Sequence, residues 1–382
     1  MNRCCRYPVG LLLLALTLVA ASSVSVGQGP VFLARWGSNG SAEGQFNYWA
    51  FGIAVDNAGY VYAADTGNHR IQKFDSDGNF VLTWGWGVLN GFAGFQTCAS
   101  GCQTGVAGSG TGQMDNPHAL AVSDTGYVYV SDAYNSRIVK FDSSGNYQTQ
   151  WGSWCDVADS GYDGCDARFQ QPWGVAVDAD GKVYVADLYN ERIQVFDSNG
   201  TFITKWGSHG SANGQFNEGL YVAVDAEGSI FVADNQNYRI QKFTLASPCP
   251  SGTSQVVAGV CFVTKWGSSG TGAGEFVGPA GMAVDTDGNL YVADFNPQGF
   301  DSNERIQKFD GDGNFILEWG SHCSVNDVGI DACDGLFWKP TAVAVDGPGN
   351  IYVLEIYNDR IQKFGGPWLD FFIGDPELSS DG

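Results

Sequence analysis

Short apolar runs separated by polar breaks rich in Asp, Asn and Gly repeat along most of this chain. The pattern is clear at residues 61–74 (VYAADTGNHRIQKF), where two runs of β-branched and aromatic residues flank a polar centre. Runs of this kind, bounded by Asp, Asn and Gly, are typical of β-strands joined by a tight turn. The stretch therefore predicts a pair of antiparallel strands.

The same stretch returns five more times with its chemistry kept. A further apolar run precedes each copy, as at 53–56, and a run ending in Trp-Gly follows the first five, as at 80–85. Turns containing Gly separate the runs, so each unit is predicted to be a four-stranded antiparallel meander. The other copies lie at 128–141, 183–196, 230–243, 290–309 (with an insertion) and 351–364.

A meander of four strands exposes two edges and two faces, so one unit alone buries too little apolar surface to be stable. Units of this length packed face to face around an axis form a β-propeller. The repeated Trp residues, from Trp36 to Trp319, lie 48 to 67 residues apart, and the variation falls in the loops. We therefore predict an all-β fold, a six-bladed β-propeller of four-stranded antiparallel blades.

The ends of the chain predict how the ring closes. The sixth unit has no fourth strand, because Gly365-Gly366-Pro367-Trp368 is too short for a turn and a strand, while residues 32–37 form an unassigned strand with the same Trp-Gly motif. Six complete blades result only if this N-terminal strand completes the last blade, and closure removes sheet edges that promote aggregation. The propeller is predicted at 31–366, followed by a C-terminal tail at 367–382.

Residues 1–26 have the features of a secretory signal peptide. Arg3 and Arg6 precede an apolar run at 11–21 that is followed by small residues. The run is too short to span a bilayer. Cleavage after Ala21 or a few residues later fits this pattern. We expect a secreted protein, extracellular or periplasmic, with no membrane insertion once the leader is removed.

Eight cysteines remain beyond the leader, in four close pairs that each fall within one predicted loop. An even number in an exported chain favours disulfide bonds, each stabilising the fold by about 2–3 kcal/mol. Free thiols or metal ligands are the alternative, although no pair has the C-x-x-C spacing of a zinc site. The expected disulfides are Cys98–Cys102, Cys155–Cys165, Cys249–Cys261 and Cys323–Cys333.

Acidic residues outnumber basic ones, with 41 Asp and Glu against 19 Lys and Arg. Without the two arginines of the leader, 17 bases face 41 acids, a net charge of −24. Eleven of the 17 bases occupy repeat positions and the other six are scattered, so no basic patch can be assembled. This distribution argues against nucleic acid and anionic membranes as partners.

An acidic residue stands five positions before an arginine in every copy without the insertion, as in Asp65 and Arg70, with Asn68 between them. Across a strand-to-strand turn such a pair can form a charge-assisted hydrogen bond. Six copies cannot form one active site, so we predict that the triplet holds the turn in place. The D-x-D-G-N turns at 75–79 and 310–314 begin like calcium loops but lead straight into a strand, which favours hairpin turns.

The pattern G-x-x-A-V-D-x-x-G-x-(V/I)-Y-V-A-D-x-x-N-x-R-I-Q-K-F-D-x-x-G-x-F-x-x-x-W-G resembles the NHL repeat, six times over residues 31–364. The resemblance implies a six-bladed propeller, in agreement with the strand count. It implies no single function, because NHL proteins include substrate modules of ubiquitin ligases, RNA binders, lyases and bacterial secreted proteins. The chain has no RING-type Cys/His cluster and no basic face, so ligase activity and RNA binding are not implied.

The residue that opens each predicted innermost strand varies, in contrast to the rest of the repeat, and should lie at one mouth of the channel. NHL-like peptide-amidating lyases have a Pro-His there that supplies a zinc ligand, and Pro117-His118 resembles it. A catalytic zinc needs three protein ligands, which the other five mouth residues cannot supply, so His118 is expected to be a hydrogen-bonded mouth residue. The six mouth positions are Phe51, His118, Trp173, Leu220, Ala280 and Thr341.

Aromatic residues gather in the turns and loops predicted on the same face. They suit sugar rings, peptides or a protein partner, although packing between blades is an alternative for each of them. The insertion at 295–302 departs most from the repeat, and departures from a rigid scaffold are where function tends to lie. The expected ligand-binding residues are Phe51, His118, Trp173, Tyr134, Tyr189, Tyr238, Phe295 and Tyr357.

These features favour a secreted, monomeric binding or interaction scaffold that engages a protein, peptide or glycan through the loop face around the channel mouth, without a cofactor. The alternative is a metal-dependent lyase or lactone/ester hydrolase. Its divalent metal would sit at the channel mouth, held by His118 with acids such as Asp115 and Glu218. A divalent metal with a structural role is a further alternative.

Overall fold

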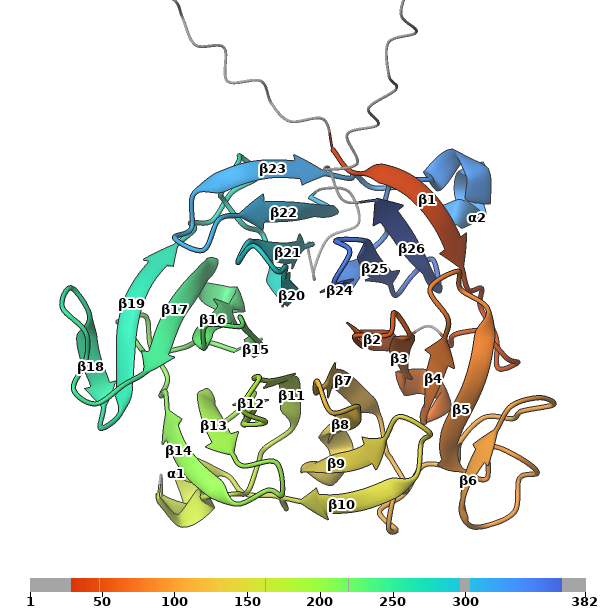
Figure 1. Ribbon diagram of the computed structural model, residues 1–382, viewed down its shortest axis with the longest axis horizontal. Coiled ribbons are helices and arrows are strands. Elements are labelled where there is room, and N and C mark those ends of the chain that lie inside the picture. Colours follow the sequence, from red (N-terminus) through yellow and green to blue (C-terminus); the bar gives the residue numbers. More distant parts are fainter. Residues whose placement is uncertain (1–28, 48, 162, 219, 296–302, 366–382) are drawn as a thin grey trace, which may run out of the picture.

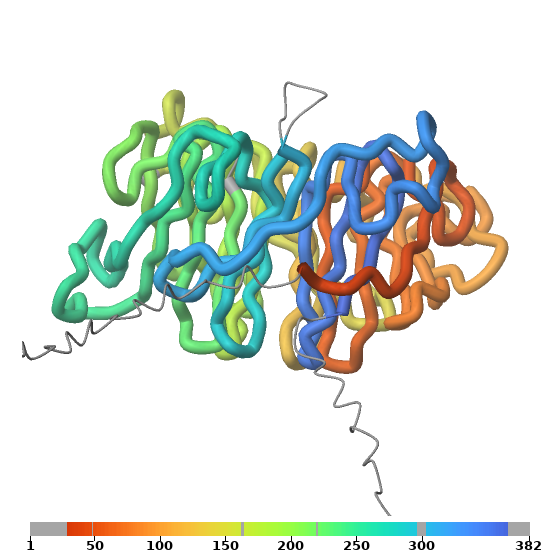
Figure 2. Tube along the Cα trace, turned by 90° about the horizontal axis from the view of Figure 1, so that it is seen from above, coloured from red at the N-terminus to blue at the C-terminus, as the bar shows by residue number. Residues whose placement is uncertain are grey.

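The computed structural model describes residues 29–47, 49–161, 163–218, 220–295 and 303–365. The predicted signal peptide, the C-terminal tail and residues 296–302 of the insertion lie outside these ranges. Within them the chain forms six antiparallel sheets arranged in a ring around a central axis (Figure 1). Seen edge-on, the ring is a disc with turns at its two faces (Figure 2). The predicted six-bladed propeller is confirmed.

The strands of each blade follow one another outward from the axis. Blade 1 contains β2 (Ala50–Val55), β3 (Val61–Asp65), β4 (Arg70–Phe74), β5 (Phe80–Trp86) and β6 (Phe95–Cys98). Blade 2 contains β7 (Pro117–Val122), β8 (Tyr127–Asp132), β9 (Arg137–Asp142) and β10 (Tyr147–Trp151). Blade 3 contains β11 (Pro172–Val177), β12 (Val183–Asp187), β13 (Arg192–Phe196) and β14 (Phe202–Trp206).

The second half of the chain repeats this order. Blade 4 contains β15 (Leu220–Val224), β16 (Ser229–Asp234), β17 (Arg239–Leu245), β19 (Val260–Trp266) and, outermost, β18 (Ser254–Val257). Blade 5 contains β20 (Pro279–Val284), β21 (Leu290–Asp294), β22 (Arg305–Phe309) and β23 (Phe315–Trp319). Blade 6 contains β24 (Pro340–Val345), β25 (Ile351–Glu355), β26 (Arg360–Gly365) and β1 (Val31–Trp36).

Blades 1 and 4 have five strands, which corrects the prediction of four strands in every blade. In blade 1 the connection after β5 folds back, so that Phe95 pairs with Trp86. In blade 4 the connection before β19 does the same through β18, where Gln255 pairs with Cys261. Both connections are long enough to satisfy the outer edge of the sheet with backbone hydrogen bonds, which reduces the exposed edge.

The N-terminal strand closes the ring as predicted. β1 pairs antiparallel with β26, from Val31 opposite Gly365 to Trp36 opposite Ile361, and the two strands lie side by side in Figure 1. Arg35 of β1 also forms ion pairs with Asp331 and Asp334 in the loop that leads into blade 6. Strand pairing and these ion pairs together join the two ends of the propeller.

The apolar core is divided among the interfaces between blades. Six buried clusters are found among the described residues, each drawing on two neighbouring blades. Trp84 of blade 1 is fully buried, with its ring 6.1 Å from Tyr62 of its own blade and 5.8 Å from Phe141 of blade 2. Gly145, at φ +78°, faces this ring, and a Cβ there would approach it to 2.9 Å. The repeated Trp therefore packs blade against blade, and the Gly of the turn leaves room for it.

The acid–arginine pair of each repeat is buried and formed in all six blades. Arg70 also donates to the carbonyl of Ala42 over 2.7 Å, so the pair joins the turn to the loop entering the blade. The prediction that these residues hold the turn is confirmed. The arginine Nε to carboxylate distances are 2.8 Å for Asp65/Arg70, 2.8 Å for Asp132/Arg137, 2.9 Å for Asp187/Arg192, 2.7 Å for Asp234/Arg239, 3.2 Å for Asp294/Arg305 and 2.6 Å for Glu355/Arg360.

The four predicted disulfides are all present. Their expected location within loops needs correction for two of them, because Cys98 ends β6 and Cys261 lies in β19. The other two close loops that contain the short helices α1 (Val157–Ser160) and α2 (Val325–Val328). No helix in the described part of the chain is long and apolar enough to cross a membrane.

Candidate functional site

The turn after the second strand of a blade lies against the start of the innermost strand of the next blade. The Thr66 hydroxyl donates to the carbonyl of Pro117 over 2.6 Å, and the Asn235 amide donates to the carbonyl of Pro279 over 3.0 Å. These turns and strand starts therefore share one face of the disc, as predicted. We call it the mouth face, made of the first residues of β2, β7, β11, β15, β20 and β24, the turns after β3, β8, β12, β16 and β25, and Phe295 after β21.

Three of the predicted ligand-binding residues form a compact aromatic group at the channel mouth. The Phe51 and His118 rings are stacked, with centroids 4.3 Å apart and planes 16° apart. Trp173 lies 3.6 Å from His118 and 6.0 Å from Phe51, and Trp49 extends the group outward, 5.7 Å from Phe51. The strand starts of blades 1 to 3 thus fill their side of the channel mouth with rings.

His118 differs from the prediction made for it. Its side chain is 3% exposed, and neither ring nitrogen has a hydrogen-bond partner among the described residues. Burial between aromatic rings lowers the pKa of His118 well below its ordinary value, because the charged imidazolium is poorly solvated there. The expected hydrogen-bonded mouth residue is instead a neutral ring packed between Phe51 and Trp173.

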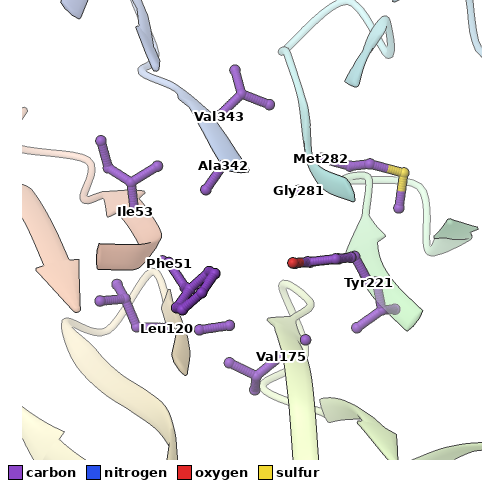
Figure 3. A pocket seen from close by; sticks show the side chains of 13 residues that line it. Phe51, Ile53, Leu120, Val175, Tyr221, Gly281, Met282, Ala342 and Val343 are labelled. Carbon is purple, nitrogen blue, oxygen red and sulfur yellow. The ribbon is translucent and has the colours of Figure 1, made fainter. Parts of the chain in front are cut away.

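Tyr221 completes the aromatic group, and it was missed in the sequence. Its ring projects across the channel toward Phe51 (Figure 3). Burial raises the pKa of its phenol to about 12, while the Trp173 side chain opposes this shift. A signal was available in the repeat alignment, because the equivalent residues of the other five blades are all Gly or Ala. They are Gly52, Ala119, Gly174, Gly281 and Ala342.

The strand that carries Tyr221 is paired differently from its counterparts. In five blades the innermost strand contains a register shift near its start, as between Pro172 and Val175 of β11. In blade 4 the pairing is regular, with Leu220 opposite Asp234 and Tyr221 opposite Ala233. The large residue therefore coincides with the one innermost strand that lacks the bulge. The side chain of Leu220, the predicted mouth residue of blade 4, lies outside the described part.

The channel beneath the aromatic group is apolar. Two cavities of about 40 and 210 Å³ follow one another along the axis and share the side chains of the innermost strands. Figure 3 shows Ile53, Leu120 and Val175 around the first of them. The described linings are mostly aliphatic, and the Tyr221 phenol is their one titratable group. Polar interactions with a ligand are therefore better supported on the mouth face than in the channel.

A pocket of about 210 Å³ opens on the mouth face between blades 3, 4 and 5, and we call it the mouth-face pocket. It exists because the strand start of blade 5 is Ala280, where blades 1 to 3 place a large ring. Three of the predicted ligand-binding residues meet here, namely Trp173, Tyr189 and Phe295. The full lining is Trp173, Leu188, Tyr189, Glu218, Tyr221, Asn235, Gln236, Ala280 and Phe295.

The remaining predicted residues lie elsewhere on the mouth face. Tyr134 occupies the turn of blade 2 and is 62% exposed. Tyr238 ends the turn of blade 4 and packs against the apolar cluster between blades 4 and 5. The Tyr357 ring contacts Trp338 at 5.2 Å in blade 6. The fold thus brings together two groups of predicted residues and leaves these three apart from both.

The zinc site of the amidating lyases is not reproduced by the residues of this face. Within the described residues no cluster of three or more His, Cys, Asp or Glu side chains could hold a metal ion. His118 is enclosed by rings, Asp115 lies 3.6 Å from His69, and Glu218 lines the mouth-face pocket. The donors proposed from the sequence therefore do not fit a shared divalent metal.

The NHL repeat family model matches this chain at residues 50–74, 114–141, 169–196 and 276–299. The matched segments fall in blades 1, 2, 3 and 5, and each contains the acid that pairs with the repeat arginine. The resemblance to NHL repeats inferred from the sequence is confirmed.

Curated relatives are similar over part of the chain. Protein brain tumor from Drosophila melanogaster is 26% identical over 51% of this chain and 16% of its own length. NHL repeat-containing protein 3 from Mus musculus is 30% identical over 41% of this chain and 54% of its own. A probable peptidyl-alpha-hydroxyglycine alpha-amidating lyase from Caenorhabditis elegans is 27% identical over 40% and 37%. The chain thus aligns with about half of their length or less.

Among solved structures, a gluconolactonase from Xanthomonas campestris superposes with a TM-score of 0.52 at 12% identity, over 90% of this chain and 99% of that one. At this level of identity the likeness concerns the fold alone.

Proposed function

This chain is an NHL-repeat protein, and on that premise we propose that it is a binding scaffold whose ligand site is the mouth face. The observation that carries the proposal is the contrast between the two parts of the repeat. The buried pairs and the interblade Trp recur in all six blades, whereas the mouth positions change from blade to blade and gather aromatic side chains around a pocket. Variable, aromatic-rich positions on a rigid frame are typical of recognition surfaces.

The partner supported best is a protein or peptide, with a glycan as the second ligand class. Aromatic side chains with a polar tip, such as Tyr134 and Tyr189, are exposed on the mouth face and supply contact area at small entropic cost. Four disulfides support an oxidising location, so we place the protein outside the cytoplasm, extracellular or periplasmic.

The test compares the two faces of the disc in a screen of peptide and glycan arrays. We expect Trp49→Ala combined with Tyr134→Ala to weaken binding of the captured ligand at least tenfold. The matched control, Tyr60→Ala combined with Tyr127→Ala, removes aromatic side chains near the opposite strand ends and should change binding less than twofold. Equal losses in both proteins, or no ligand for the wild type, would contradict the proposal.

The rival hypothesis of a metal-dependent lyase or hydrolase is favoured by one relative, but no set of metal donors is found among the described residues of the mouth face. Metal analysis of the purified protein separates the two. One tightly held zinc or calcium per chain that is lost in His118→Ala would favour the enzyme.

A further inference from the structure

We propose that the mouth-face pocket binds the ammonium group of a lysine side chain presented by a peptide segment. The inference deepens the proposed function and rests on it, because it names the ligand chemistry of one part of the binding face. Three properties of the pocket carry it: its aromatic walls, its carboxylate and its charge balance.

Four of the nine described lining residues are aromatic. Trp173, Tyr189, Tyr221 and Phe295 come from blades 3, 4 and 5 and border the same space. The faces of such rings carry negative charge density and attract cations within about 6 Å of their centroid. The chain uses this interaction nearby, since the Lys339 ammonium lies 5.6 Å from the Phe295 centroid and 3.9 Å from the Glu304 carboxylate.

Among the described residues of the lining, Glu218 is the only carboxylate, and it is exposed. Glu191 is the main cause that raises the pKa of His209, and Glu218 adds to this effect. Glu218 forms no ion pair within 4.0 Å among the described residues. The equivalent residues of the other blades are not acidic, so the charge is particular to this pocket. They are Trp49, Asn116, Gln171, Gly278 and Lys339.

Charge balance and size favour a cation over a neutral ligand. The described residues of the lining include one acid and no Lys, Arg or His. The whole chain has a net charge of −22, which raises the local concentration of cations. The pocket volume of about 210 Å³ exceeds the ~150 Å³ that accommodates benzene in an apolar cavity, so an alkyl ammonium chain fits within it. Leu188 and Ala280 can cover the methylene groups while Glu218 faces the charge.

The test uses two short peptides, acetyl-Gly-Lys-Gly-amide and its uncharged analogue with norleucine in place of lysine. Titration followed by tryptophan fluorescence or calorimetry should show the lysine peptide binding at least tenfold tighter, with weaker binding at higher salt. Glu218→Gln should reduce its affinity at least fivefold. Glu227→Gln makes the same charge change in the exposed turn between β15 and β16 and should keep affinity within twofold.

A second pair of variants examines the aromatic wall without changing charge. Tyr189→Ala should weaken the lysine peptide at least fivefold, whereas Tyr60→Ala, which removes an exposed tyrosine near the opposite strand ends, should leave it unchanged. Equal binding of the two peptides, or equal losses in Glu218→Gln and Glu227→Gln, would overturn the inference. Binding of a neutral oligosaccharide that exceeds that of the lysine peptide would also overturn it. Any of these results leaves the array comparison of the two faces to decide the proposed function separately.

Discussion

At the scale of single residues, buried polar groups in this protein fall into two kinds. The repeated kind is paired, as in Asp65, which accepts hydrogen bonds from Asn68, Arg70 and Gln72 inside the blade. Residues of the second kind are each found in one blade. His118 has no hydrogen-bond partner among the described residues, and Glu304 is fully buried beside Lys339. The first kind holds the repeat together, and both kinds make stability depend on pH.

The repeated pair predicts a large loss of stability when one partner is removed. Arg70→Met leaves the Asp65 carboxylate buried without its cation and frees the Ala42 and Gln45 carbonyls. We expect a loss of about 3–5 kcal/mol, measured by chemical denaturation. Arg168→Met removes an exposed arginine and should change stability by less than about 0.5 kcal/mol. Similar values for the two variants would show that the pair is not structural.

Glu304 predicts a fall in stability as the pH rises. Burial raises its pKa to about 7, while Lys339 opposes the shift, so the folded state favours the neutral carboxyl. The stabilisation is complete below the ordinary pKa of 4.5 and is lost as the pH passes through 7, by about 1–3 kcal/mol. Asp132, with its pKa raised to about 6, acts in the same direction.

The Glu304→Gln variant isolates this contribution, because Asp132 remains. Denaturation at pH 5.0 and 7.5 should show a smaller difference in the variant than in the wild type. An unchanged difference would mean that Glu304 is ionised throughout this range.

His118 predicts the opposite dependence. Its pKa is lowered by burial, so folding disfavours the proton, and the stability that depends on the neutral ring is lost as the pH falls below about 6.5. His118→Phe keeps a stacked ring and removes two buried nitrogens without partners. We expect a gain of about 1–2 kcal/mol at pH 7 and a larger gain at pH 5. A loss at both values would indicate that the imidazole has a partner in solution.

At the scale of elements, the loops entering blades 3 and 6 are built alike. Each contains a short helix and a disulfide with a sequence separation of 10, Cys155–Cys165 and Cys323–Cys333. The carbonyl of Cys165 accepts from Arg192, and that of Cys333 accepts from Arg360. The disulfides therefore stabilise the loops at the point where the repeat arginine holds them.

Removing one of these disulfides should cost more than removing an outer one. For Cys323→Ser combined with Cys333→Ser we expect a loss of about 3 kcal/mol, from loop-closure entropy, seen as a lower melting temperature. The Cys98–Cys102 bond closes a shorter loop at the edge of blade 1, and its double Ser variant should lose about 2 kcal/mol. The reverse order would show that strain or contacts outweigh loop length.

At the scale of the whole molecule, the ring depends on a strand from the start of the chain. Trp36 of β1 contacts Phe74 of blade 1 and Tyr352 of blade 6, so this strand both completes a sheet and packs the interface that closes the ring. An apolar cluster shared by blades 1 and 6 lies beneath it. β1 therefore contributes to the interface between blades 6 and 1, which closes the ring.

A truncation tests this closure. A chain that begins at Ser38 lacks β1 and should unfold at a lower denaturant concentration, with a broader transition and a tendency to associate through the exposed β26 edge. A chain that begins at Gly29 keeps β1 and should unfold as one cooperative unit. Closure is not needed for stability if both proteins behave alike in denaturation and size-exclusion measurements.

The four strands common to all blades, the six blades, the closing strand, the acid–arginine pairs and the disulfides all followed from the sequence. Each arises from a local pattern that the repeat displays several times, such as Asp65 and Arg70 across one turn. The variable mouth positions also stood out by comparison between copies. Repetition supplies the comparison that a single sequence otherwise lacks.

Features that depend on unrelated segments meeting in space needed the fold. The added strands β6 and β18 arise where long connections reach a free sheet edge. The His118 ring has no hydrogen-bond partner among the described residues because Phe51 and Trp173 enclose it, and the pocket exists because Ala280 is small beside Trp173 and Tyr221. A sequence pattern specifies which face of a strand is buried, but the partners of a buried side chain are set by packing between blades.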